Sequence, residues 1–523
     1  MRRGQHGRNL LLLRALPGDH GAEADLTDPL FGAWAAARLR DRVTGPPPVD
    51  RPDVRFLTAE HDTISFSVRL EDRDDRRGLL GLTPSAPLTD AEAAHWQECF
   101  TDAWRLLVTR HRAAALLLAD VLTCVVPVES DAGAAGISAT SADAFGAVAM
   151  SRPADATGLA VGLLHEAQHS VLNATSYLFD LHLDPRDRGY SPWRDDPRPA
   201  SGVLHGAYAY LAVTRFWRTE AGTTGDPLAT FEFCRWREAV AGTAERLLST
   251  GRLTAAGRRF TGALLDEVRP WPAEPADPRI VHLARLANDD HYVRWRLRNL
   301  RPDPSPLVAA FHRGDPPPPP TSQLRTDSRR ALSHSPRLKA IHDLLRRGEV
   351  VARLSTGAPA ADSPVDNSAE LSDPRATLPP TQRGGGGGGG RADFKIERSG
   401  GDGGSRADFK IERGGEGGGR TDFKIERGGE GGGRADFEVE RDHERGARHP
   451  SSEQTREIRP AAVEAALLAG DYGTVRRAYT GKDLDLELTP LIIAGGVGAR
   501  AEDVAALVRA GCAPGRVIEW IVG

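Results

Sequence analysis

The residues with the clearest chemical meaning are His165, Glu166 and His169, which form an H-E-x-x-H motif in the segment GLLHEAQHSVLNA. On a helix, positions i and i+4 lie one turn apart on the same face, so both imidazoles can reach one metal ion, with the glutamate beside that face. The spacing therefore predicts a zinc or iron site. Spacing alone does not choose between the two metals.

Two histidines leave such a metal short of a third protein ligand. The metzincin pattern is excluded, because Leu172 and Thr175 stand where it needs Gly and His. Glu220 or Glu232, each on a later helix, could complete a different zinc set, although neither lies in a recognisable acidic motif. We expect the third ligand to be His205, which opens the segment VLHGAYAYLAVTRFW.

His182 is a weaker candidate for this metal. If one helix runs to Asp184, His182 lies about 20 Å beyond His169 along its axis, too far to share the ion. A proline-rich loop between the two histidine segments carries Arg194 and Arg198. A guanidinium fixed there could pair bidentately with a carboxylate of a cofactor or substrate. The alternative is a plain surface cluster of arginines and aspartates.

The elements that must position these residues follow an α+β order. A strand candidate at 54–70 precedes a helix from Thr89, where Glu92 completes a capping box, to about Asp120. Two β-rich runs then cover 121–128 and 144–150. The motif lies on a helix from Asp155 or Thr157 to Asp184, which Pro185 stops. A second helix covers 202–217, and the chain looks helical to Phe311.

Two chemistries fit this constellation. The first is a zinc metallopeptidase with Glu166 as general base. The second is a non-haem iron oxygenase, in which three protein ligands leave room for a 2-oxo acid and dioxygen, and the arginine holds the distal carboxylate.

The motif, the YSPWRDDPRP loop and the LLHGAYAYLAVTRFW helix together resemble a family. They are similar to the HExxH-type 2-oxoglutarate-dependent peptide β-hydroxylases, which modify ribosomally made precursor peptides. The resemblance covers roughly residues 120–300, with a weaker likeness at LLAGDYGTVRRAY near the C-terminus. It implies an Fe(II) centre at His165, His169 and His205 with Glu166 nearby, and 2-oxoglutarate bound by an arginine among Arg194 and Arg198.

The composition divides the rest of the chain. We expect a mainly helical metal-binding catalytic domain with a small sheet at 1–315 and a Pro-rich linker at 316–382, interrupted by an amphipathic helix at 336–351. A Gly-rich, disordered repeat segment follows at 383–455, and a small C-terminal domain of helical hairpins at 456–523.

The Gly-rich segment contains an octapeptide, R-[AT]-D-F-[KE]-[IV]-E-R, in four copies. Arg, Asp, Phe, Glu and the closing Arg are the same in all copies, whereas the spacers drift. An extended copy would be apolar on one face and charged on the other, as expected of a peptide that pairs with a sheet edge or lies in a groove. This pattern predicts a substrate. The alternatives are a low-complexity linker or a docking tail for another protein.

The flexible-chain estimate gives a span of about 45 to 55 Å between the catalytic domain and the first copy, so the enzyme can reach its own tail. We therefore expect hydroxylation of the repeats, at the Asp β-carbon first, in a fused enzyme and precursor. The expected targets are Asp393, Asp408, Asp422 and Asp436.

Composition excludes several other classes of protein. A net charge of −4 gives no electrostatic signature of nucleic-acid binding. The apolar runs are too short for a membrane span, and Arg14 interrupts the one that imitates a signal peptide, so we expect a cytoplasmic protein. Cys99, Cys124, Cys234 and Cys512 show no ligand spacing and are expected to serve in packing.

Overall fold

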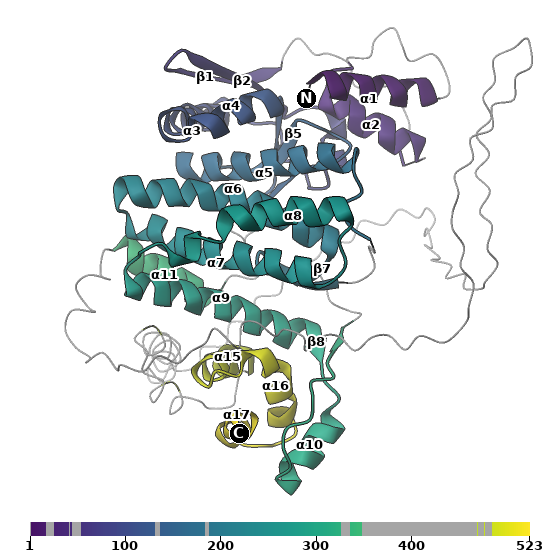
Figure 1. The fold of residues 1–523 in the computed structure, drawn as a ribbon. Coiled ribbons are helices and arrows are strands. Elements are labelled where there is room, and N and C mark those ends of the chain that lie inside the picture. The colour runs from purple at the N-terminus through teal and green to yellow at the C-terminus, as the bar shows by residue number, and fades with distance from the viewer. Residues whose placement is uncertain are drawn as a thin grey trace, which may run out of the picture. The chain divides into compact units, whose positions relative to one another are not determined.

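The computed structural model describes residues 2–16, 26–40, 42–43, 54–130, 136–183, 188–325, 335–347, 468, 475 and 484–523. Contacts group 1–378 and 455–523 into one compact unit. The second unit, 379–454, lies wholly outside the described residues, as do the four octapeptide copies and their aspartates. The expected α+β class is confirmed: helices dominate around a small mixed sheet (Figure 1).

Five strands form the main sheet in the order β1-β2-β3-β5-β4. They are β1 (Arg55–His61), β2 (Ile64–Leu70), β3 (Cys124–Val128), β4 (Ser138–Ala139) and β5 (Ala147–Ser151). β2, β3 and β5 are parallel, while β1 and β4 pair antiparallel at the two edges. β3 and β5 are buried at every position, as is usual for inner strands covered on both faces.

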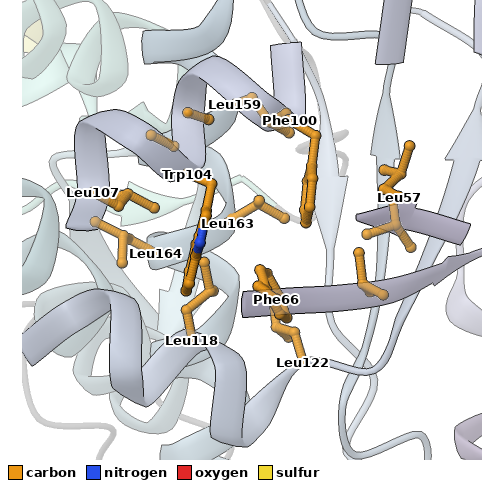
Figure 2. Packing of buried hydrophobic residues seen from close by; sticks show 14 of the residues in the cluster. Leu57, Phe66, Phe100, Trp104, Leu107, Leu118, Leu122, Leu159, Leu163 and Leu164 are labelled. Carbon is orange, nitrogen blue, oxygen red and sulfur yellow. The ribbon is translucent and has the colours of Figure 1, made fainter. Parts of the chain in front are cut away.

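Helices cover both faces of this sheet. The apolar cluster on one face draws on α3 (Asp90–Arg110), α4 (Arg112–Val121) and α5 (Ala156–Ser176). Figure 2 shows its centre, where Trp104 and Phe100 of α3 meet Phe66 of β2 and Leu163 of α5. The opposite face is covered by α2 (Pro29–Leu39) and the short helix η1 (Asp75–Leu80).

The helices that follow in the chain stack beyond α5 (Figure 1). They are α6 (Ala200–Thr224), α7 (Pro227–Ser249), α8 (Ala255–Val268) and α9 (Pro278–Asn299), with the 3-10 turn η2 (Trp271–Ala273). A β-hairpin, β6 (Arg188–Ser191) and β7 (Arg194–Pro199), precedes α6. The other described elements are α1 (Arg2–Ala15), β8 (Leu300–Arg301), α10 (Pro304–Arg313), β9 (Gln323–Leu324) and α11 (Pro336–Arg346).

The described C-terminal elements are α15 (Leu484–Ala494), η3 (Gly498–Arg500), α16 (Ala501–Arg509) and α17 (Pro514–Val522). They share an apolar core with α9 and α10. A buried ion pair joins α9 to α16, because Arg296 donates to both oxygens of Glu502, at 2.7 and 2.5 Å. The domain boundaries expected from composition, at 315, 382 and 455, stay predictions.

Several expected elements have different limits. The strand expected at 54–70 is a hairpin that turns at Asp62 and Thr63, both with positive φ. The helix expected to reach Asp120 is broken at His111 into α3 and α4. The strands expected at 121–128 and 144–150 begin three residues later. The capping box of Thr89 and Glu92 is confirmed.

The motif helix and its neighbours also differ from the prediction. α5 ends at Ser176, eight residues before the expected stop, whereas α6 is longer than the expected 202–217. The expected loop before α6 is the β6–β7 hairpin. α11 ends at Arg346, and residues 348–351 of the expected helix lie outside the described ones. The four cysteines are free and buried, as expected.

Candidate metal centre

One face of helix α5 packs in the hydrophobic core, and another face carries His165 and His169. Asp155 caps its start by accepting a hydrogen bond from the Gly158 amide at 2.7 Å. Leu159 and Leu163 lie one turn apart in the core cluster on the sheet. Burying side chains of this size contributes about 1.5 to 3 kcal/mol each, which fixes the rotation of the helix.

His165 and His169 converge on one point. Their Nε2 atoms lie 3.1 Å apart, and their rings meet edge to face. Two nitrogens that share a metal at about 2.1 Å are separated by roughly 3.0 to 3.4 Å. The ligand atoms of His165, Glu166 and His169 all lie within 4.8 Å of one another, so this group could hold a metal ion.

Burial keeps both imidazoles in the form that binds metals. It lowers the pKa of His165, with Glu166 acting weakly in the opposite direction. It lowers the pKa of His169 well below the ordinary value, and the neighbouring His165, His205 and Arg198 add to the effect. Neutral imidazoles offer a lone pair at neutral pH. The donor set therefore fits a borderline divalent metal such as zinc or iron(II).

Glu166 is a fixed, buried carboxylate beside the two rings. The Ser138 hydroxyl on β4 donates to its Oε1 at 2.6 Å, and the Thr140 hydroxyl donates to its Oε2. Oε1 also lies 3.9 Å from Nε2 of His165. The edge strand β4 and the residue that follows it thus hold this carboxylate beside the two imidazoles. Sequence reasoning did not find Ser138 and Thr140, because hydroxyls across a strand and a helix leave no spacing pattern.

His205 enters from α6, beside α5. Its ring centroid lies 5.7 Å from that of His169, with the two ring planes nearly parallel. Rings that ligate one ion have centroids roughly 4.5 to 6 Å apart, so this separation is compatible with a shared metal. Burial, with smaller effects from His182 and Arg198, lowers the pKa of His205 to about 4.

The hairpin before α6 brings both candidate arginines to this region, and both bond to the carboxylate of Asp196. Arg194 donates through Nε to Asp196 at 2.8 Å, and Arg198 reaches the same carboxylate through one terminal nitrogen at 3.3 Å. Nε of Arg198 is buried and has no hydrogen-bond partner among the described residues. Its guanidinium lies close against Gly202 and influences His169 and His205 electrostatically.

Two aromatic residues complete the surroundings of the site, and the sequence analysis did not single them out. Tyr210 of α6 meets the His165 ring edge to face, with centroids 5.2 Å apart. Trp193, at the tip of the hairpin, stacks on Tyr210 at 5.0 Å. A Cβ on Gly206 would come within 1.8 Å of the Trp193 indole nitrogen. Glycine at 206 therefore lets the hairpin lie directly on α6, next to His205.

The other candidate ligands are occupied elsewhere. Glu220 accepts from His111 at 2.7 Å and pairs with Arg110. Glu232 pairs with His342 and accepts from the Trp236 indole. These partners explain why neither glutamate serves the centre that the HExxH helix forms.

The reason given for discounting His182 is wrong, because α5 ends before it. His182 instead forms an isolated antiparallel bridge with Leu253 and lies close enough to His205 to lower its pKa. It belongs to the surroundings of the site. Like His205, it is not one of the three residues whose ligand atoms all lie within 4.8 Å of one another.

Comparisons with known proteins add no assignment. Comparison with protein-family models finds no match, and comparison with curated proteins finds none either. Among the described residues, no helix combines the length and the apolar character needed to cross a membrane.

A cavity of about 330 Å³ lies away from the two motif histidines, beside Arg237, Glu274 and His282.

Proposed function

We propose that this chain is an iron- and 2-oxoglutarate-dependent hydroxylase of peptide side chains, similar to the HExxH-type peptide β-hydroxylases. The observation that carries the proposal is that the Nε2 atoms of His165 and His169 lie 3.1 Å apart, with the His205 ring stacked beside His169 and the buried Nε of Arg198 close by. Three neutral imidazoles are a complete protein set for a metal that must keep open positions.

The arginine separates this proposal from simple metal binding. Burying a guanidinium nitrogen without a hydrogen-bond partner lowers the stability of the fold, and a carboxylate is the usual partner of such a group. Arg198 influences two of the three imidazoles electrostatically, so a small dicarboxylate held by it would lie beside the metal. Arg194, whose Nε already binds Asp196, serves better to orient that aspartate.

The reaction class follows from these parts. Iron(II), when bound, supplies the centre at which the 2-oxo acid and dioxygen react. One oxygen atom enters a C–H bond of the peptide, and the other appears in succinate as carbon dioxide leaves. The chain's own part is to hold the ligands and to anchor the distal carboxylate through Arg198. Glu166, fixed by Ser138 and Thr140, keeps its charge at a constant position beside the centre.

The proposed substrate is the repeated octapeptide of the same chain, with the β-carbons of Asp393, Asp408, Asp422 and Asp436 as the favoured positions. Support comes from the constant Asp and Phe among drifting spacers, and from the reach of the tether. Tethering gives an effective concentration around a millimolar, so weak recognition is sufficient.

Intact mass spectrometry tests this proposal. The full chain, purified without oxygen, receives Fe(II) and 2-oxoglutarate and is then exposed to air. We expect additions of 16 Da, up to four, which are absent from His165→Ala and present in His312→Ala, an exposed histidine far along the chain. An unchanged mass, together with no succinate, would contradict the proposal.

One observation favours a second function, a zinc metallopeptidase. The Glu166 carboxylate lies 3.9 Å from Nε2 of His165, where a general base could reach a metal-bound water. In that case the chain with Zn(II) would cleave peptides, including the spacers between the repeats, without any requirement for oxygen. The repeats would then serve as a linker or docking tail.

A further inference from the structure

The segment that follows the motif helix is unusual for its exposed apolar side chains. Tyr177, Leu178, Phe179 and Leu183 are 56%, 76%, 53% and 62% exposed. They make up four of the nine large hydrophobic residues that are exposed among those described. Scattered exposed apolar residues are ordinary, whereas four within one seven-residue segment point to a binding surface. We call these four side chains the 177–183 ledge.

The ledge has a fixed backbone. The Thr254 amide donates to the Leu181 carbonyl at 3.2 Å, and the Leu183 amide donates to Arg252 at 2.8 Å. Leu181 itself is buried in the cluster that joins α5, α6 and α7. At the other end, the Tyr177 hydroxyl donates to the Ala142 carbonyl at 3.0 Å. Arg8 of α1 lies over the Tyr177 ring, 5.1 Å from its centroid. The segment that carries the exposed side chains is therefore held at both ends.

The ledge is also next to the metal centre. Tyr177 directly follows α5, eight residues after His169, which corresponds to about 12 Å along a helix. His182, within the same segment, lies close enough to His205 to influence its pKa. A peptide that rests on the ledge is thus within a few residues of the imidazoles.

We propose that the 177–183 ledge is the docking surface for the apolar face of the octapeptide repeats, so that Phe and Ile or Val of each copy lie on it. The occupant is named from the proposed function, on which this inference rests. In an extended copy Phe394 and Ile396 share one face, and Asp393 lies on the other. Docking through the apolar face leaves the Asp face available to the metal centre.

The chain's connectivity supports this occupant. Residues 348–467 connect the segment after α11 to Leu468, which packs against the described helices. The repeats are therefore tethered at both ends to the unit that carries the ledge. Each copy offers two or three apolar side chains between Gly-rich spacers, and no other stretch of 348–467 repeats such a pattern.

Photo-crosslinking tests the inference independently of catalysis. The full chain carries p-benzoylphenylalanine in place of Phe179, and a control carries it in place of Phe56, which is 58% exposed on β1. After irradiation without metal or 2-oxoglutarate, the crosslinked peptides are mapped by mass spectrometry. Docking on the ledge predicts at least about tenfold more crosslinks to residues 391–441 from position 179 than from position 56, because tethering alone favours neither position.

A second variant makes the result specific. Serine replaces the phenylalanine of all four copies, Phe394, Phe409, Phe423 and Phe437. We expect the crosslinks from position 179 to fall to the level of the position 56 control. Equal crosslinking from both positions, or crosslinks that survive the serine variant, would overturn the inference. Crosslinks between ledges of ¹⁴N- and ¹⁵N-labelled chains would instead assign this surface to a dimer and overturn it as well.

The outcomes for the two proposals are separable. Crosslinks to the repeats without any gain of 16 Da support the ledge and contradict the hydroxylase. Gains of 16 Da without crosslinks support the hydroxylase and contradict the ledge.

Discussion

Replacing Gly206 by alanine should disturb the site without removing any functional group. The added Cβ would come within 1.8 Å of Nε1 and 2.2 Å of Cε2 in the Trp193 indole. Ordinary contact begins at 3.4 Å, so the ring must retreat by about 1.6 Å. A rigid indole at the tip of a hairpin cannot do this by rotating one bond, and its stacking on Tyr210 at 5.0 Å must open.

The magnitude follows from two opposing effects. Overpacking of this kind costs about 1 to 3 kcal/mol, and losing the aromatic contact costs about 0.5 to 1.5 kcal/mol. Alanine in place of glycine within a helix returns about 0.5 to 1 kcal/mol. We therefore expect Gly206→Ala to lower the free energy of unfolding by about 2 kcal/mol.

Gly222→Ala is the matched control, because it changes the same residue type in the same helix. A Cβ at Gly222 meets nothing within 4 Å, so this variant should be more stable by about 0.5 to 1 kcal/mol. Urea denaturation followed by circular dichroism measures both variants. Because Trp193 borders the site, Gly206→Ala should also weaken Co(II) binding, whereas Gly222→Ala should not. A Gly206→Ala variant as stable as Gly222→Ala, with unchanged Co(II) affinity, would refute the reasoning.

Three further outcomes are expected. Arg198→Lys should raise the apparent KM for 2-oxoglutarate at least about tenfold, because lysine cannot form the bidentate pair with a carboxylate, and Arg194→Lys should change this KM less. Steady-state succinate formation measures both variants. Equal effects on KM would contradict the assignment of Arg198. Glu502→Ala should lower the free energy of unfolding by about 3 to 5 kcal/mol in urea denaturation, because it leaves the buried Arg296 guanidinium without its carboxylate partner. A change below about 1 kcal/mol would contradict this expectation. Stability of the metal-free chain should fall as pH drops from about 6.5 towards 4, because the unfolded chain takes up a proton that His205, with its pKa of about 4, does not. His205→Asn should flatten that decline, and a stability that rises on acidification would contradict the sign.

The motif and its helix could be predicted because the signal is local. The HExxH spacing fixes which residues share a face, and Asp155 and the capping box of Thr89 and Glu92 mark where helices begin. His205 was also predicted, from its position at the start of the next helix-forming segment. The structure places its ring 5.7 Å from that of His169, and its role as the third ligand stays a prediction.

The errors come from long-range contacts. α5 ends at Ser176 in a region where Leu181 is buried against α6 and α7, a contact with no local marker. His111 breaks the α3–α4 helix while stacking on Phe216 at 4.4 Å and hydrogen bonding with Glu220. The hairpin at Asp62 and Thr63 turns without glycine, the usual signal for positive φ.

Residues that support the site were the hardest to foresee. Ser138 reaches Glu166 from β4, an edge strand of two residues that is too short for a recognisable pattern, and Thr140 reaches it from the residue after that strand. The fit of Trp193 over Gly206 depends on the β6–β7 hairpin, and the prolines of 192–199 led to the prediction of a loop there. Such partners become visible only when the topology is known.

We propose that three imidazoles and an arginine of this chain form an iron and 2-oxo acid centre. Its most direct test is succinate formation by the full chain purified without oxygen, with its bound metal determined in the same sample. We predict one iron per chain and succinate released only when Fe(II), 2-oxoglutarate and oxygen are all present, with both lost in His169→Ala. Tightly bound zinc, with no succinate under any of these conditions, would contradict the account.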